Sequence, residues 1–361
     1  MLKVVAAAAS VTAAISLSLL SCSSSANSPG NRSASGAPSA VCGSKPVKMG
    51  MVVGASNSFL KLTYGEVKNK FANCSNVSVK FVTANNSADT YNAAVNALTA
   101  QGYDAIITDA QFGDQSLGAL RAGYKAGLVL IPYINVPSGE PGKDFSTAVN
   151  LGRDKEIQLW GDWLNKTLNG QGNIVFLGGL PGAPLSQKEN SSLKEELRVK
   201  APGIKFLTDA AVTTDWDPAQ EQQAVAGLIS KYPKIDAVVS DYGGATMGAA
   251  RAFQAAGLPV PPVATTASTN EFRCAIADIR KTLPNFQFFS VDGVVRIPAV
   301  AGEKAVAAVN SGTKSEPSTD FTDFVVWDTT GSNPPKCDAS LPPDADLSST
   351  LTQTEMAAAR K

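Results

Sequence analysis

One stretch in the second half of the chain shows the pattern that recurs along it. The apolar run 235–239 is typical of a strand buried on both faces, and it stops just before Asp241. The glycines at 243–244 predict a turn, and the small apolar residues spaced through 245–256 predict a helix that ends at a following glycine. In open α/β sheets, ligands lie outside the carboxyl ends of strands. Asp241 and Tyr242 are therefore predicted to face a ligand.

The same alternation of apolar runs and amphipathic stretches covers most of the chain. In the first half it predicts strands at 47–54, 78–83, 105–109 and 128–134 and helices at 59–71, 89–101 and 115–126. It restarts with helices at 154–168, 186–200, 218–231, 272–281 and 297–309 and strands at 173–177, 205–211, 261–266 and 287–291. Strands that alternate with helices predict parallel sheets covered on both faces. The fold class is thus α/β, with two doubly wound parallel-sheet lobes.

The composition of the chain excludes several classes of protein function. The 361 residues are 44% hydrophobic, which is enough for two lobes with their own cores, and 31 basic residues balance 31 acidic ones. This neutral balance argues against a nucleic-acid partner. The chain contains no histidine, so mechanisms that need one and histidine-ligated zinc sites are excluded. We predict no metal and no cofactor.

The amino-terminal residues indicate export. Lys3 precedes the apolar stretch 4–20, and Leu-Leu-Ser-Cys at 19–22 is similar to a bacterial lipobox, in which Cys22 is lipidated. We predict a signal peptide at 1–21 and a lipid-anchored flexible linker at 22–44, rich in Ser, Asn, Gly, Pro and Ala. An uncleaved membrane helix is the alternative.

Besides Cys22, the chain has an even number of cysteines, which would form disulfides in an oxidising compartment: Cys42, Cys74, Cys274 and Cys337. Cys42 precedes the first predicted strand and Cys74 follows the first helix, so both lie at the same sheet edge and could reach each other. Cys274 and Cys337 would then pair in the second lobe. The sequence leaves the connectivity open, and free buried thiols are the alternative.

The order of elements and the segment Ser-Asp-Tyr-Gly-Gly-Ala-Thr-Met-Gly-Ala at 240–249 resemble the type I periplasmic binding proteins, in particular the ribose-type sugar receptors of ABC importers. The resemblance covers residues 47–314. Repressors of the LacI type share this fold, but they carry an amino-terminal DNA-binding module where this chain has a signal and linker.

The resemblance also implies how the lobes are composed. The family's chain crosses between lobes three times, which here falls near 136–149, 292 and 315–321. An amino-terminal lobe would contain 45–148 plus 293–318, and a carboxyl-terminal lobe 149–292 plus 319–361. This arrangement places Cys274 and Cys337 in one lobe.

Sugar receptors of this family stack aromatic rings on the ligand and hydrogen-bond its hydroxyls with planar polar side chains. We predict that Asp109 and Asp241 bind ligand because they end strands of the two lobes, where helix amino-termini help to stabilise charge. At the positions that match the family's binding residues, the predicted ligand-binding residues are Ser56, Asn57, Phe59, Tyr133, Asn135, Gln187, Trp216 and Asp292. The family's arginines after the fourth strand and in the helix after the glycine-rich turn are missing, because these places read Tyr-Ile-Asn at 133–135 and Gln-Lys-Glu at 187–189. A pentitol or tetritol is therefore a candidate beside a pentose.

The predicted protein is a monomeric solute receptor on the extracytoplasmic face of a bacterial membrane, not an enzyme, that delivers a sugar or sugar alcohol to the permease of an ABC transporter. Three alternatives remain at this stage: a lipoprotein that senses its ligand for a membrane receptor, a receptor for another solute such as an amino acid, and a glycosidase that uses a carboxylate pair.

Overall fold

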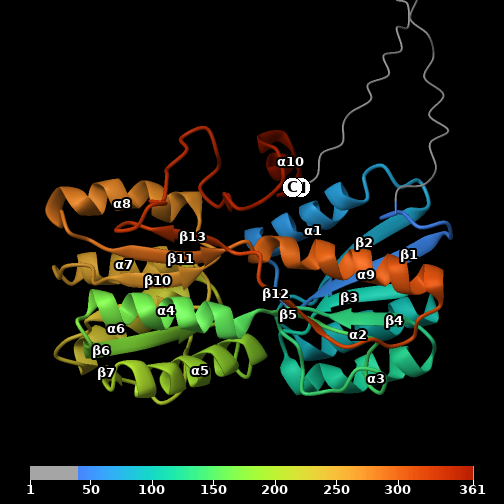
Figure 1. Cartoon of the computed structure of the whole chain (residues 1–361), viewed down its shortest axis with the longest axis horizontal. Coiled ribbons are helices and arrows are strands. Elements are labelled where there is room, and N and C mark those ends of the chain that lie inside the picture. Colours follow the sequence, from blue (N-terminus) through green and yellow to red (C-terminus); the bar gives the residue numbers. More distant parts are fainter. Residues whose placement is uncertain (1–39, 361) are drawn as a thin grey trace, which may run out of the picture. The chain divides into compact units, whose positions relative to one another are not determined.

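A computed structural model describes residues 40–360. This part of the chain is one compact body with two large sheets. The first sheet is parallel and has the order β2-β1-β3-β4 (Figure 1). Its strands are β1 (Val47–Val53), β2 (Val77–Thr83), β3 (Ala105–Asp109) and β4 (Val129–Pro132). The helices that accompany it are α1 (Ser58–Lys70), α2 (Ala88–Ala100), η1 (Gly113–Ser116), α3 (Leu117–Lys125) and the later α9 (Ile297–Ser311). β1 and β3 are buried almost throughout, which explains their continuous apolar runs.

The second sheet has the order β13-β11-β10-β9-β6-β7, with β8 paired to β6. Its strands are β6 (Gln171–Gly178), β7 (Gly203–Phe206), β8 (Val212–Thr213), β9 (Ala237–Ser240), β10 (Val263–Thr266), β11 (Phe288–Asp292) and β13 (Val325–Asp328), the last antiparallel to β11. Its helices are α4 (Arg153–Thr167), α5 (Pro184–Lys200), α6 (Pro218–Lys231), α7 (Thr246–Ala255) and α8 (Asn270–Thr282). The strand predicted at 205–211 is wrong in extent, because the structure divides this region into β7 and β8.

The chain passes between the sheets at several places. β5 (Val149–Leu151) follows the first sheet and pairs in parallel with β12 (Thr319–Phe321), which leads to β13. Between β11 and α9, the short helix η2 (Val294–Arg296) carries the chain back to the first sheet, where α9 packs on β3 and β4. The site described below lies where these passages meet.

The carboxyl-terminal tail departs from the prediction that 319–361 lies wholly in the carboxyl-terminal lobe. Helix α10 (Gln353–Ala359) packs on α1 of the first lobe, as Figure 1 shows. Leu351 and Met356 form an apolar cluster with Leu62 of α1 and Val295 of η2. Burial of these side chains decides the position of the tail, and the sequence alone does not show which lobe would receive them.

Both predicted disulfides are confirmed. Cys42 is bonded to Cys74 across 32 residues and Cys274 to Cys337 across 63 residues. Loops of these lengths correspond to a stabilisation of about 3–4 kcal/mol each in the chain-entropy picture. Next to the first bond, the side-chain Oδ1 of Asn310 in α9 accepts hydrogen bonds from the backbone N–H of Ser44 and Lys45 at 2.7 and 2.8 Å. The first described residues are thus attached both to the loop before β2, through the disulfide, and to α9, through Asn310.

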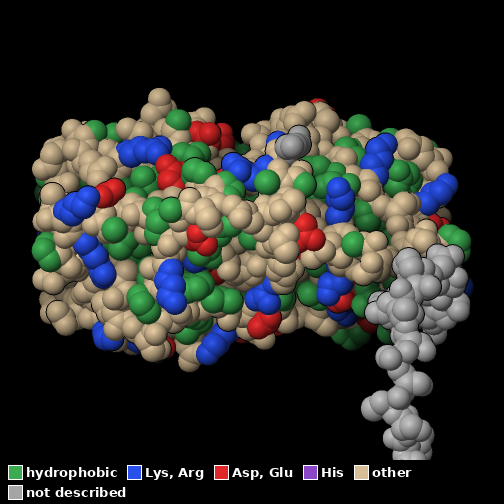
Figure 2. Space-filling model, turned by 90° about the horizontal axis from the view of Figure 1, so that it is seen from above, with side chains coloured by type: hydrophobic (Ala, Val, Ile, Leu, Met, Phe, Trp, Pro, Cys, Tyr) green, Lys and Arg blue, Asp and Glu red, His purple; other side chains and the backbone are tan. Residues whose placement is uncertain are grey.

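The signal peptide at 1–21, Cys22 and most of the linker lie outside the described residues. Within residues 40–360, no helix is long and apolar enough to cross a bilayer. On the face in Figure 2, basic and acidic side chains are interspersed and do not gather into a patch of one sign. This distribution agrees with the neutral net charge.

Candidate functional site

A small cavity of about 40 Å³ lies between the carboxyl ends of the strands of both sheets. The first lobe contributes the loops after β1, β3 and β4, and the second lobe contributes the loops after β9 and β10 and the starts of α5 and α6. The lining residues are Asn57, Phe59, Leu60, Asp109, Gln111, Ile134, Asn135, Leu151, Leu185, Trp216, Asp241, Tyr242, Thr266, Ala267 and Val294. Six of the ten predicted ligand-binding residues are among them: Asn57, Phe59, Asp109, Asn135, Trp216 and Asp241.

Trp216 and Asp241 form the second-lobe side of the cavity. The indole Nε1–H of Trp216 donates to Asp241 Oδ1 at 2.9 Å, and the Ser186 hydroxyl donates to Asp241 Oδ2. Trp216 has a positive φ of 54°, a rare conformation for a bulky residue, and its ring lies so close to Gly179 that no side chain would fit there. Asp217 caps α6 directly after it. The tryptophan is thus held in one orientation by its backbone, its neighbour and its N–H.

Asp109 and Asn135 form the opposite side. Asp109 Oδ1 accepts from Asn135 Nδ2 at 2.8 Å and from the Asn135 backbone N–H at 3.3 Å. The amide Oδ1 of Asn135 accepts from the backbone N–H of Leu185 at 3.0 Å. Leu185 lies in the first turn of α5, whose N–H groups have no partner within the helix. This bond joins the two lobes at the cavity itself.

Two further aromatic rings close the cavity near the start of α1. Phe59 and Tyr242 lie edge to face, with ring centroids 5.7 Å apart. Asn57 caps α1 by accepting from the backbone N–H of Leu60 at 2.9 Å, which places Phe59 in the first turn. Gln111 Oε1 accepts from the backbone N–H of Ala55 at 2.8 Å. The rings from both lobes can cover C–H groups of a ligand.

Both carboxyl groups of the cavity are buried, and burial is the main cause that raises the pKa of Asp109 and of Asp241 to about 7. Hydrogen bonds from Asn135 to Asp109, and from Ser186 and Trp216 to Asp241, act in the opposite direction. Among the described residues that line the cavity, none is a lysine or arginine. The site therefore suits a ligand that donates hydrogen bonds, and it disfavours an anionic one.

These pKa values predict that the ligand-free protein loses stability as the pH rises. An acid with a raised pKa in the folded state stabilises that state fully below its unfolded pKa of about 4, and this contribution is lost as the pH rises through about 7. Burial also raises the pKa of Glu156 to about 7 and of Glu221 to about 8, in the same direction. We expect the melting temperature to fall between pH 5 and pH 8, as measured by calorimetry.

The matched control for this prediction is Asp109→Asn. It keeps the oxygen that accepts from Asn135 but cannot ionise. The variant should show a shallower decline than the parent over the same range. A melting temperature that rises from pH 5 to pH 8, or equal slopes in both proteins, would contradict the assignment.

Three predicted residues do not line the cavity. Ser56 is exposed at the loop before α1, and Gln187 is exposed on the outer face of the first turn of α5. Tyr133 is fully buried beneath the loop, and its hydroxyl has no hydrogen-bond partner among the described residues. In α5 the side chain that reaches the cavity is Leu185, two positions earlier than predicted.

Asp292 is the fourth predicted residue outside the cavity lining, and protein groups occupy its carboxylate. It forms a buried ion pair with Arg273, and it accepts from the backbone N–H of Ser268 at 2.9 Å and from the Ser268 hydroxyl at 2.7 Å. The Ser290 hydroxyl also donates to it. The guanidinium of Arg273 lies 4.3 Å from the ring centre of Trp327. Asp292 does not line the cavity, and its contacts are those of a structural ion pair beside the passage between lobes.

Several lining residues were not predicted. Thr266 ends β10 as Asp109 ends β3, so the same strand-end argument could have found it. Ile134 and Ala267 follow β4 and β10 with positive φ values of 53° and 55°, which no sequence pattern indicates for these residue types. Leu185 is an ordinary apolar helix residue in the sequence.

Residues 51–280 match the sequence profile of the family described as periplasmic binding protein domain. A xylitol-binding protein from Mycolicibacterium smegmatis is 29% identical over 238 residues, which are 64% of this chain and 64% of that protein. The match thus spans slightly less than two thirds of that relative.

Solved structures share the fold. A galactofuranose-binding protein is 20% identical with a TM-score of 0.69, covering 78% of this chain and 94% of its own. A Mycobacterium smegmatis protein in complex with β-D-fucofuranose is 21% identical with a TM-score of 0.67, covering 78% and 91%. An arabinose-binding component of an ABC transporter from Shewanella is 19% identical with a TM-score of 0.67, covering 78% and 92%. The predicted two-lobed α/β fold class is confirmed.

Proposed function

Because the chain belongs to the periplasmic binding protein domain family, whose members bind solutes outside the cytoplasm, we propose that it is a lipid-anchored receptor that captures a small sugar alcohol and delivers it to an ABC permease. A pentitol such as xylitol, or a tetritol, is the ligand class. The lipobox-like sequence ending at Cys22 supports the anchor.

The observation that carries the ligand class is the pair Asp109 and Asp241, one from each lobe, in an aromatic-lined cavity without a basic residue among the described lining side chains. A polyol loses its hydrogen bonds to water on entry, and carboxylates replace them with charge-assisted bonds from its hydroxyls. A ligand with a carboxylate, such as an α-amino acid or a sugar acid, would find no cation to pair with.

The size of the cavity favours a short chain. Leu185 in the first turn of α5 occupies part of the space between the lobes, and about 40 Å³ remains. A ligand of four or five carbon atoms requires less enlargement of this space than a hexose does. The xylitol-binding relative points in the same direction.

Capture depends on closure of the lobes. Asp109 and Asn57 lie in one lobe, and Asp241 and Trp216 in the other, so a ligand contacts both sets only in the closed state. Differential binding to that state shifts the population towards it, and no chemical step is needed.

A thermal-shift panel tests the proposal. The mature chain, made without its lipid, is heated with xylitol, arabitol, erythritol, ribose, galactose, xylonate and alanine at millimolar concentration. A ligand at about 100 times its Kd stabilises the folded state by roughly 2.7 kcal/mol, a shift of several degrees. We expect one or more pentitols or tetritols to raise the melting temperature and xylonate and alanine not to do so.

The outcome separates the alternatives. A shift with ribose or galactose and none with any polyol would replace the polyol by a ring sugar. A shift with xylonate or alanine would contradict the inference that the carboxylates of Asp109 and Asp241 disfavour a ligand that carries a carboxylate. If no compound raises the melting temperature, the proposed ligand class is wrong.

A further inference from the structure

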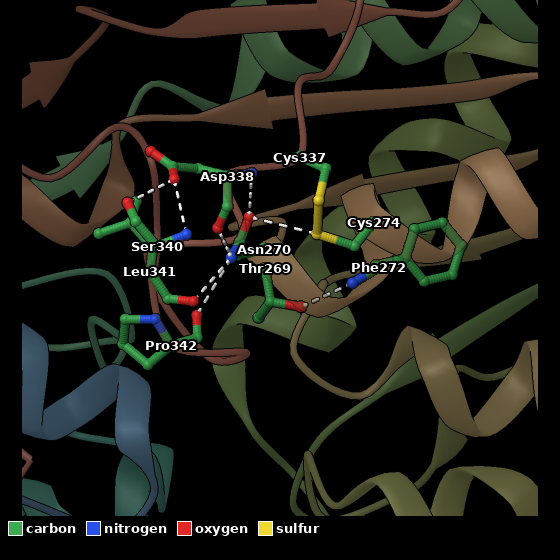
Figure 3. The surroundings of a disulfide bond; sticks show 9 residues. All are labelled: Thr269, Asn270, Phe272, Cys274, Cys337, Asp338, Ser340, Leu341 and Pro342. Carbon is green, nitrogen blue, oxygen red and sulfur yellow. Dashed lines mark hydrogen bonds between the residues drawn. A yellow bond between two sulfur atoms is a disulfide. The ribbon is translucent and has the colours of Figure 1, made fainter.

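The tail after the second sheet, residues 333–360, runs across both lobes, and we call it the C-terminal strap. Its first part is attached to α8 of the second lobe, as Figure 3 shows. The disulfide Cys274–Cys337 links the beginning of the strap to α8. The side-chain Nδ2 of Asn270 donates to the carbonyls of Asp338 at 2.8 Å and Leu341 at 3.1 Å, and the backbone N–H of Asp338 donates to Asn270 Oδ1 at 3.0 Å.

The attachment to the second lobe continues to Ala345. The backbone N–H of Glu271 donates to Pro343 O at 2.6 Å, and the backbone N–H of Asn270 donates to Ala345 O at 2.9 Å. Ala345 is fully buried. Ala345 also belongs to the apolar cluster that contains Leu62 of α1, so the strap reaches the first lobe directly after these bonds.

The second part of the strap is attached to α1 of the first lobe. Glu66, a buried carboxylate of α1, accepts from the Ser349 hydroxyl at 2.6 Å, from the Thr350 backbone N–H at 2.7 Å and from the Thr350 hydroxyl. Helix α10 then lies against α1, where a Cβ at Gly65 would come within 2.8 Å of the side chains of both Leu351 and Ala359. Close packing of the two helices thus depends on the glycine.

Only residues 346–348 separate the two attachments. They are also fixed to the passage between lobes, because the backbone N–H of Gly293 donates to the Ser348 hydroxyl at 2.9 Å. From Ala345 to Ser349, a fully extended chain spans at most about 14 Å. The amino end of α8 and the middle of α1 cannot part by more than this length allows while both attachments hold.

From this geometry we propose that the C-terminal strap is a further tether between the lobes, which limits how far they open and retains the ligand. It adds to the passages at β5, β12 and β11. Opening beyond its reach requires α10 to leave α1. The amplitude of opening is therefore set by contacts outside the ligand cavity.

The test compares Gly65→Gln with the control Gly227→Gln. Both replace a helical glycine with the same good helix former, but the space around Gly227 in α6 is open. A second variant ends the chain after Ser348 and removes the hydrogen bonds to Glu66 and the whole of α10. Hydrogen exchange at 353–359 reports whether α10 is released, and small-angle scattering of the ligand-free protein reports the opening.

We expect released α10 and a larger radius of gyration in Gly65→Gln and in the shortened chain, with Gly227→Gln equal to the parent. Where xylitol binds, its dissociation rate measured by tryptophan fluorescence should rise about fivefold or more. Scattering is measured without ligand, so this result does not depend on the proposed ligand. An unchanged scattering profile in a folded variant whose α10 exchanges freely, or in the folded shortened chain, would overturn the tether.

Discussion

Replacing Trp216 by alanine is expected to lower the affinity for the proposed sugar-alcohol ligand by at least about 100-fold, which corresponds to about 2.7 kcal/mol. The change removes the largest aromatic face of the cavity and the N–H that orients Asp241 at 2.9 Å. It also leaves the space above Gly179 unfilled. Titration calorimetry on the folded variant measures the loss.

The conservative variant Trp216→Phe separates the two contributions. It keeps an apolar ring but cannot donate to Asp241, so a smaller loss of about tenfold is expected. Equal affinity of Trp216→Ala and the parent would show that the ring does not contact the ligand. The cavity between the lobes would then not be the binding site.

Asp292→Ala is expected to reduce the free energy of unfolding by about 3–5 kcal/mol, because it removes the carboxylate that pairs directly with the buried guanidinium of Arg273. The buried Asp346 carboxyl interacts with Arg273 electrostatically but forms no ion pair with it among the described residues. The Ser268 hydroxyl and the Trp327 ring would remain as its neighbours. Urea denaturation followed by circular dichroism measures the change. The affinity of the remaining folded protein for the proposed sugar-alcohol ligand should stay within about twofold of the parent.

A double replacement provides the control. Arg273→Met combined with Asp292→Leu removes both charges and should recover most of the lost stability, since an apolar pair of similar volume often replaces a buried ion pair without cost. If Asp292→Ala instead left stability unchanged and weakened xylitol binding strongly, Asp292 would have the ligand-contacting role first predicted for it.

The parts of the fold that could be predicted are those decided by local pattern. The apolar run at 235–239 and the following small-residue stretch appear as β9 and α7, because burial on both faces leaves a continuous signal. Asp109 and Asp241 were found by the same reasoning, since residues that end parallel strands lie at one edge of the sheet.

The parts that could not be predicted depend on partners distant in sequence. Asp292 and Gln187 were chosen by position, but nothing local shows that Arg273 would occupy the first or that the second would face solvent. The destination of α10 depends on the fit of Leu351 and Ala359 against Gly65. Such contacts exist only once both lobes are assembled.

The disulfide Cys42–Cys74 has a mechanical consequence. A pull on the amino end of the chain enters the described part near Cys42, a few residues before β1. The covalent bond passes this load to Cys74, in the loop before β2, and the bonds from Ser44 and Lys45 to Asn310 pass part of it to the end of α9. The force is thus shared by three elements instead of peeling β1 from the middle of its sheet. Were the proposed lipid anchor to pull on the chain, these connections would keep the first lobe folded under the load.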